Sequence, residues 1–178
     1  MYVPQTQPIK AIRAKIVFCE GLEVDGSQMP NGEYRVGLSS ASKALGYSDK
    51  WLRQALKRSE ATAKALQGLG FEGNFLEVFR ESNQGNSFSE RTISLDDFKH
   101  LITYGVIKGK QKAIALQTAL TKIALTDFFR DSFNDVPLTI QDRRSLFYKT
   151  YAESLSVEDW LEMEREDVTD LILPGDTE

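Results

Sequence analysis

Two short helical patterns, one on each side of Gly46, restrict the fold of this chain more than any other feature of its sequence. Two helices that meet at a large angle need a left-handed backbone position in the turn, which glycine adopts at little cost. They also need small residues where they cross, and Ala41 and Ser42 supply them. Apolar residues then recur at the spacing that would hold the second helix against the first, namely Leu52, Ala55 and Leu56. We therefore predict a helix-turn-helix over residues 38–58.

The opposite side of the second predicted helix is basic. Residues 35–58 contain six basic side chains and one acidic one, Asp49. Arginine suits the edge of guanine and glutamine suits the edge of adenine, so Arg53 and Gln54 are the candidates for base contacts. The amides of the first turn, together with Ser48, are placed to bind a phosphate. The predicted DNA contacts of this segment are Ser40, Lys43, Ser48, Lys50, Trp51, Arg53, Gln54, Lys57 and Arg58. A plain helical hairpin with a solvated basic face and a core Trp51 is the alternative.

The pattern before the helix-turn-helix predicts an antiparallel meander. Strands are expected over residues 9–18, 22–24 and 33–36, joined by turns at Asp25-Gly26 and at residues 30–32. The helices that follow are expected over residues 41–45, capped by Ser39 or Ser40, over residues 49–58, capped by Ser48, and over residues 60–69.

A second strand pair follows the helices. Strands are predicted over residues 75–80 and 92–95, separated by a polar loop over residues 81–90 that is too long for a tight hairpin. A strand pair with a polar tip after a helix-turn-helix is the arrangement of a wing that contacts phosphates. The residues expected to do so are Arg80, Asn83, Gln84, Asn86 and Arg91. An ordinary loop is the alternative interpretation.

The remaining sequence has a helical pattern. Helices are expected over residues 95–106, after a capping signature formed by Ser94 and Asp97, and over residues 110–133, whose apolar residues cover more than one face and indicate a central place in the core. Two more are expected over residues 139–151 and 156–167. The predicted fold class is α+β, with an N-terminal meander, a helix-turn-helix and a wing-like hairpin before a mainly helical C-terminal part. We divide it into a DNA-binding region, 1–107, and a helical region for core packing or oligomerisation, 108–178.

The net charge of −4 hides a gradient along the chain. Residues 151–178 carry ten acidic side chains and one basic side chain, so the other 150 residues carry a net charge of +5. A basic segment beside an acidic tail can bind phosphate with one part and regulate that binding with the other. The acidic end, residues 153–170, is also a candidate surface for a basic protein partner. The single cysteine, Cys19, lies in an apolar run and is expected to be buried, and the absence of a signal-peptide or membrane-span pattern predicts a cytoplasmic, nucleoid-associated protein.

Residues 36–48 resemble the N-terminal domain of phage antirepressors and Bro-type proteins. Those domains have a β-hairpin that leads into Val-x-Leu-x-x-x-x-Lys-Ala-Leu-Gly-Tyr-Ser, and here the motif ends in Lys43-Ala44-Leu45-Gly46-Tyr47-Ser48. Two later motifs correspond to Ile93-Ser94-Leu95 with Phe98, and to Gly109 with Lys112, Ala113 and Leu116. The resemblance covers roughly residues 20–133 and implies a DNA-binding regulator of phage or mobile-element origin. The strand before the motif departs from the family pattern, because Tyr34 is its only aromatic residue.

Enzyme signatures are weak in this sequence. His100 is the only histidine, which excludes a histidine metal cluster, and there is no phosphate-binding glycine loop. A magnesium-dependent nuclease needs clustered carboxylates beside a lysine, which two sets imitate with arginine: Asp25, Glu33 and Arg35, or Glu72, Glu77 and Arg80. The leading hypothesis is a non-enzymatic regulator without a cofactor that binds duplex DNA as a homodimer. The alternatives are a protein-interaction module and the nuclease.

Overall fold

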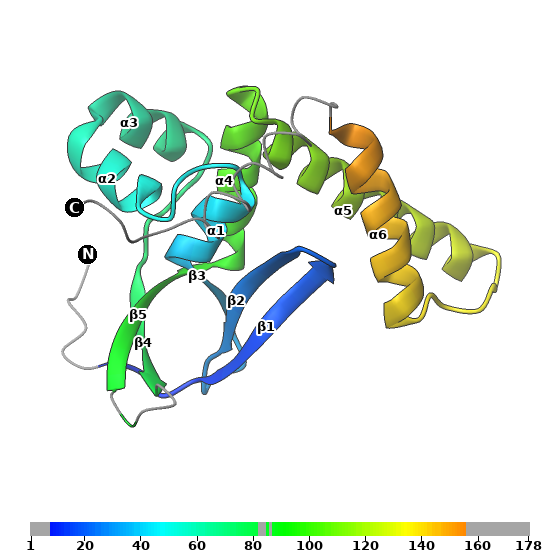
Figure 1. Cartoon of the computed structure of the whole chain (residues 1–178), viewed down its shortest axis with the longest axis horizontal. Helices are drawn as coiled ribbons and strands as arrows, with labels where there is room; N and C mark the ends of the chain where they lie inside the picture. The colour runs from blue at the N-terminus through cyan, green and yellow to red at the C-terminus, as the bar shows by residue number, and fades with distance from the viewer. Residues whose placement is uncertain (1–7, 82–84, 86, 156–178) are drawn as a thin grey trace, which may run out of the picture.

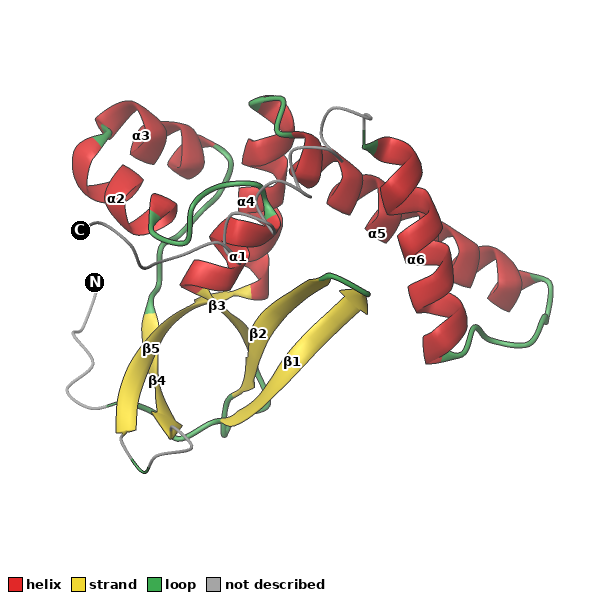
Figure 2. Cartoon of the chain, viewed as in Figure 1, coloured by secondary structure: helices red, strands yellow, loops and turns green. Residues whose placement is uncertain are grey.

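The computed structural model describes residues 8–81, 85 and 87–155 of the chain. One antiparallel sheet of five strands lies at the base of the fold, and the helices gather beyond one end of it (Figures 1 and 2). The strands lie in the order β1-β2-β3-β5-β4 and comprise β1 (Ile12–Cys19), β2 (Leu22–Gln28), β3 (Tyr34–Gly37), β4 (Leu76–Glu81) and β5 (Ser87–Ser94). The sheet is strongly curved (Figure 1), and Ile9 forms an isolated parallel bridge with Val78 of β4. The segment that leads into β1 therefore meets the opposite edge of the sheet.

One predicted turn of the meander is correct and the other is wrong. Residues 30–32 do form a turn, with Gly32 at a φ of 87° and the amide of Met29 donating to the carbonyl of Glu33 over 2.8 Å. Gly26, in contrast, lies inside β2, paired with Ala14 and Val36. A Cβ atom on Gly26 would lie 2.6 Å from the side chain of Ile16. Because Gly26 has no side chain, the side chain of Ile16 can pack closely against the backbone of β2. Gly26 is therefore a strand residue and not a turn residue.

The predicted long loop over residues 81–90 is also wrong. The ladder between β4 and β5 continues to the pair Glu81 and Ser87, so only residues 82–86 connect the strands. An exposed hairpin tolerates polar side chains because the ladder already satisfies the backbone groups. Because residues 87–91 are mostly polar, the sequence pattern did not predict that the first half of β5 is a strand.

Six helices in the described part of the chain complete an α+β fold and confirm the predicted class. Three caps follow the local sequence, since the hydroxyls of Ser59, Ser94 and Thr139 each accept a hydrogen bond from the amide three residues later. The helices are α1 (Leu38–Ala44), α2 (Trp51–Arg58) and α3 (Glu60–Gly68), which lie between β3 and β4 in the chain, and α4 (Leu95–Ile107), α5 (Gln111–Ser132) and α6 (Ile140–Ser154).

Core residues from both predicted regions, before and after residue 107, pack into one hydrophobic cluster. The sheet contributes Val24 and Ile93, and the helices contribute Leu52, Leu101 and Leu116. Only the first half of α5 contributes fully buried residues, namely Ala113, Ala115, Leu116 and Ala119. In its second half Ile123 still packs against the core, but Leu125, Phe128 and Phe129 are exposed, with Phe128 at 73%. The prediction that this entire helix is central to the core is therefore wrong for its C-terminal half. The helix expected over residues 156–167 lies outside the described residues.

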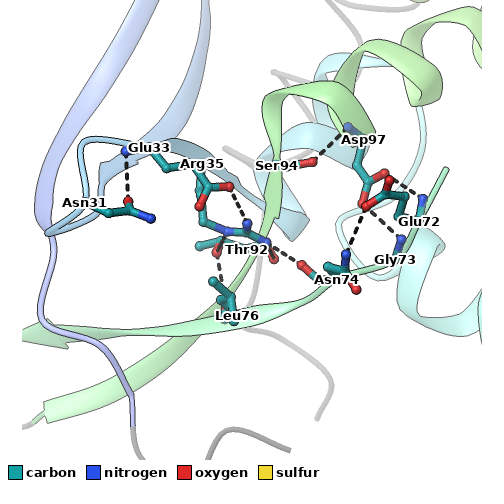
Figure 3. A network of polar contacts seen from close by, with 10 residues as sticks. All are labelled: Asn31, Glu33, Arg35, Glu72, Gly73, Asn74, Leu76, Thr92, Ser94 and Asp97. Atoms are coloured by element: carbon teal, nitrogen blue, oxygen red, sulfur yellow. Dashed lines mark hydrogen bonds and ion pairs between the residues drawn. The ribbon is translucent and has the colours of Figure 1, made fainter. Parts of the chain in front are cut away.

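A polar network fixes the segment between α3 and β4 to the rest of the fold (Figure 3). The carboxylate of Asp97, whose residue is 1% exposed, accepts hydrogen bonds from the amides of Glu72 over 2.8 Å and Gly73 over 3.0 Å. On the sheet side, the buried guanidinium of Arg35 donates to Thr92 and to the carbonyl of Asn74. The predicted cap of α4 is present, because the Ser94 hydroxyl accepts a hydrogen bond from the amide of Asp97. The carboxylate of Asp97, however, binds the segment between α3 and β4 and takes no part in the cap.

Candidate nucleic-acid interface

Gly46 ends α1 in the left-handed conformation that the sequence predicts, with a φ of 85°. The amide of Gly46 donates to the carbonyl of Lys43 over 3.0 Å, and the amide of Tyr47 donates to that of Ser42 over 3.1 Å. These two bonds form a Schellman motif, which satisfies the last carbonyls of the helix. Ser42 and Ala41 are fully buried, as expected for small residues at a helix crossing.

The two predicted serine caps of this region are wrong. Helix α1 begins at Leu38 with Gly37 as its N-cap, and α2 begins at Trp51 with Lys50 as its N-cap and no side-chain cap bond. The Ser40 hydroxyl instead accepts from the amide of Asp25 over 2.9 Å and donates to the carbonyl of Gly37 over 3.2 Å. This hydroxyl ties α1 to β2, so we leave Ser40 out of the candidate DNA-binding surface.

Helix α2 presents one apolar side to the fold and one basic side to solvent. Leu52 is completely buried, and Ala55 and Leu56 are half-buried beside it. Five of the predicted DNA-binding side chains on α2 and its N-cap are exposed, namely Lys50, Arg53, Gln54, Lys57 and Arg58. Lys43 on α1 and Ser48 in the connecting turn are exposed as well. We call Lys43, Ser48, Lys50, Arg53, Gln54, Lys57 and Arg58 the basic surface.

An aromatic stack attaches the start of α2 to the end of α4. The ring centroids of Tyr47 and Trp51 are 3.8 Å apart, and those of Trp51 and Tyr104 are 5.8 Å apart. Trp51 is half-buried by these contacts, which makes it primarily a packing residue. Burial raises the pKa of Tyr47 from its ordinary value of 10 to about 12.

Two lysines beside this stack add to the positive charge near α2. The ammonium of Lys110 lies 4.5 Å from the centroid of the Tyr47 ring, and that of Lys108 lies 5.6 Å from the centroid of the Tyr104 ring. Both are cation–π distances. Both lysines are 50 or more residues from α2 in the chain, so the sequence pattern did not indicate them, and only the fold brings them near Tyr47 and Tyr104.

The predicted wing does not lie beside α2. Figure 1 shows strands β4 and β5 extending away from α2 and α3. Arg91 is exposed on β5, where its guanidinium lies 5.6 Å from the ring centroid of Phe75. Asn83, Gln84 and Asn86 lie outside the described residues, as does the side chain of Arg80. The structure thus separates the hairpin from the basic surface.

Three of the four carboxylates proposed for a nuclease form ion pairs or hydrogen bonds with protein side chains. Asp25 pairs with Lys15 over 2.7 Å, and Glu33 pairs with the buried Arg35 over 2.8 Å. Glu72 accepts a hydrogen bond from the side chain of Asn74 over 3.0 Å. Within residues 8–81, 85 and 87–155, no three histidine, cysteine or acidic side chains are grouped closely enough to hold a metal ion.

Comparisons with protein-family models, curated proteins and solved structures give no match for this chain. The resemblance to phage antirepressors and Bro-type proteins therefore stays a prediction from the motif over residues 36–48. None of the helices in the described part combines the length and the apolar character that crossing a membrane requires.

Proposed function

We propose that this protein binds duplex DNA through the basic surface on α2 and its flanks. One observation carries the proposal: Lys50, Arg53 and Lys57 are all exposed on a helix whose other side is anchored by the fully buried Leu52. A helix held in this way presents its cations at fixed positions, which lowers the entropic cost of meeting a phosphate backbone. Lys108 and Lys110 extend the positive charge beyond the predicted segment.

Phosphate contacts would supply most of the affinity, and the side chains of Arg53 and Gln54 would supply base preference. Counterion release makes such binding weaken steeply with salt, whereas a hydrophobic protein interface depends on salt much less. The excess of positive charge over residues 1–150 supports this assignment, since it leaves the body of the protein attractive to a polyanion.

A matched pair of charge reversals tests the proposal. Arg53→Glu combined with Lys57→Glu should weaken binding to a fluorescent duplex by at least about tenfold and lower the salt slope by about 2. Lys10→Glu combined with Lys149→Glu makes the same change in net charge at exposed positions away from α2. This control should bind almost as tightly as the unmodified protein.

Anisotropy titrations at two salt concentrations measure both quantities. Equal weakening by the two double variants would show that overall charge, and not the α2 surface, controls binding. Unchanged binding by the α2 variant would remove the helix-turn-helix from the proposal. Circular dichroism of each variant confirms that the loss of binding is not a loss of fold.

The shortness of α2, the proposed recognition helix, supports binding by two copies of the chain. Helix α2 has only eight residues, so one copy can read only a short stretch of bases. Paired half-sites are the usual remedy in helix-turn-helix proteins. We therefore propose a regulatory role, as the family resemblance implies, in which a homodimer binds two half-sites.

A further inference from the structure

An apolar end on the α5–α6 pair is the first of two exposed surfaces that the DNA-binding proposal does not use. Figure 2 shows the far ends of α5 and α6 projecting beyond the sheet. The apolar side chains there are 53% to 75% exposed and comprise Leu125, Phe128, Phe129, Phe133, Val136 and Ile140, which we call the arm tip. Monomeric proteins seldom expose a contiguous apolar patch of this kind.

An apolar groove between the sheet and the helices is the second surface. It has a volume of about 600 Å³ and is lined by side chains of β1, β2, β3, α4 and α5. Ile12 and Tyr34 on its walls are 72% and 59% exposed, and Leu95 is 51% exposed. This volume is within the range of pockets that enclose small ligands, so it can accept more than one aromatic side chain.

The chain cannot fill its own groove with its arm tip. Gln117 and Thr121 of α5 line the groove, and Phe128 lies two turns further along the same continuous helix. At 1.5 Å per residue, Phe128 is held roughly 10 Å beyond Thr121. The two surfaces are therefore adjacent along one rigid element, and another molecule must bring them together.

From this arrangement we infer that a second copy of this chain occupies the groove, with the arm tip of each copy seated in the groove of the other. Gln117, Thr121, Ala124 and Phe128 follow the spacing i, i+4, i+7 and i+11, which places them on one face of α5. If two α5 helices lie antiparallel about a two-fold axis near residues 121–124, Phe128 of each copy lies opposite Gln117 of the other. The exposed Ala124 leaves room where the helices cross.

The area available agrees with a specific dimer. The arm tip offers roughly 450 Å² of exposed apolar surface, and the groove walls offer roughly 200 Å². Because each copy contributes both surfaces, the total that the contact can bury is at most about 1,300 Å², which is within the standard range for stable interfaces. A reciprocal contact about a two-fold axis also closes on itself, so it gives a dimer and not a fibre.

Two matched substitutions test the inference by sedimentation across micromolar to millimolar concentrations, without DNA. Phe128→Asp in the tip and Ile12→Asp in the groove replace side chains that are 73% and 72% exposed, so neither should disturb folding. Each should raise the dimer dissociation constant by about a hundredfold or more, because an aspartate would lose its water in the contact. Ile107→Asp, at a position that is 64% exposed and outside both surfaces, should leave the dimer intact.

Mixing the two variants gives the decisive result. The tip of the Ile12→Asp chain and the groove of the Phe128→Asp chain are both intact, so a heterodimer with one native junction should form, more weakly than the unmodified dimer. A monomeric unmodified protein, a dimer that only Phe128→Asp disrupts, or a mixture that stays monomeric would each overturn the inference. The Arg53→Glu and Lys57→Glu variant should still dimerise, so failure of the DNA proposal is distinguishable from failure of this one.

Discussion

Gly46 is needed for its backbone conformation and not for its lack of a side chain. Its φ of 85° is unfavourable for other residues, yet a Cβ atom there would lie no closer than 3.5 Å to Lys112. We expect Gly46→Ala to lower the free energy of unfolding by about 1–2 kcal/mol through backbone strain alone. The measurement is urea denaturation followed by circular dichroism.

Gly68 provides the matched control. It lies in α3, its φ is not positive, and no atom outside its chain neighbours and the backbone of its own helix lies within 4 Å of the position that a Cβ would take. Gly68→Ala should be neutral or stabilise the protein by up to about 1 kcal/mol. Equal effects of the two alanines would show that the turn at Gly46 carries no special conformational requirement.

Tyr151 is expected to make stability depend on pH in the alkaline range. Burial raises its pKa to about 12, and its side chain belongs to the core cluster with a residue exposure of 3%. An unfolded tyrosine loses its proton near pH 10, so between pH 10 and 12 the folded state holds a proton that the unfolded state releases. The resulting stability is complete below pH 10 and is lost as pH rises towards 12.

Urea titrations of the Tyr151→Phe variant at pH 8 and pH 11 isolate this contribution. The unmodified protein should lose about 1.4 kcal/mol more than the variant between these two values, because phenylalanine has no proton to release. Tyr148→Phe, which removes an exposed hydroxyl from the same helix, is the control. Identical losses in the unmodified protein and the Tyr151→Phe variant would contradict the assignment.

At the scale of the elements, the first turn of α4 does more than cap a helix. The Asp97 carboxylate accepts the amides of Glu72 and Gly73, which anchors the segment leading from α3 into β4 (Figure 3). Asp97→Ala would leave both amides without this acceptor and should cost about 2–5 kcal/mol of stability. Faster hydrogen exchange of these two amides should accompany the loss.

Substitution of the neighbouring Asp96 is the control, because it also removes an acidic residue from the first turn of α4 but no acceptor for the amides of Glu72 and Gly73. The side chain of Asp96 is 85% exposed and pairs with Lys99 over 3.1 Å. Asp96→Ala should cost less than about 0.5 kcal/mol, as expected of a surface ion pair. If Asp96→Ala and Asp97→Ala were equally destabilising, the helix dipole would explain both and the anchoring role would fail.

Across the whole molecule, the two proposed interaction surfaces are well separated. Figure 1 places α2 and α3 at one side and the far ends of α5 and α6 at the other. A dimer formed through the arm tips and grooves would therefore leave the basic surface of each copy open. This separation is what a regulator needs if it is to pair its subunits and to bind two half-sites at once.

The sequence alone determined the features that depend on near neighbours. The left-handed turn at Gly46, the caps at Ser94 and Thr139, and the division of α2 into a buried Leu52 side and an exposed Arg53 side all follow from residues within a few positions. Each rests on local backbone sterics or on helical spacing, which act over one or two turns. The α+β class was predictable for the same reason.

Only the tertiary structure decided the features that depend on contacts between distant residues. Gly26 continues a strand because Ile16 of β1 lies against it. The Asp97 carboxylate accepts a hydrogen bond from the amide of Glu72, which is more than 20 residues away in the chain. The hairpin that the sequence suggested as a wing extends away from α2, and half of α5 leaves the core (Figure 1). Local propensity cannot encode these outcomes, because the direction of an element is set by the elements on which it packs.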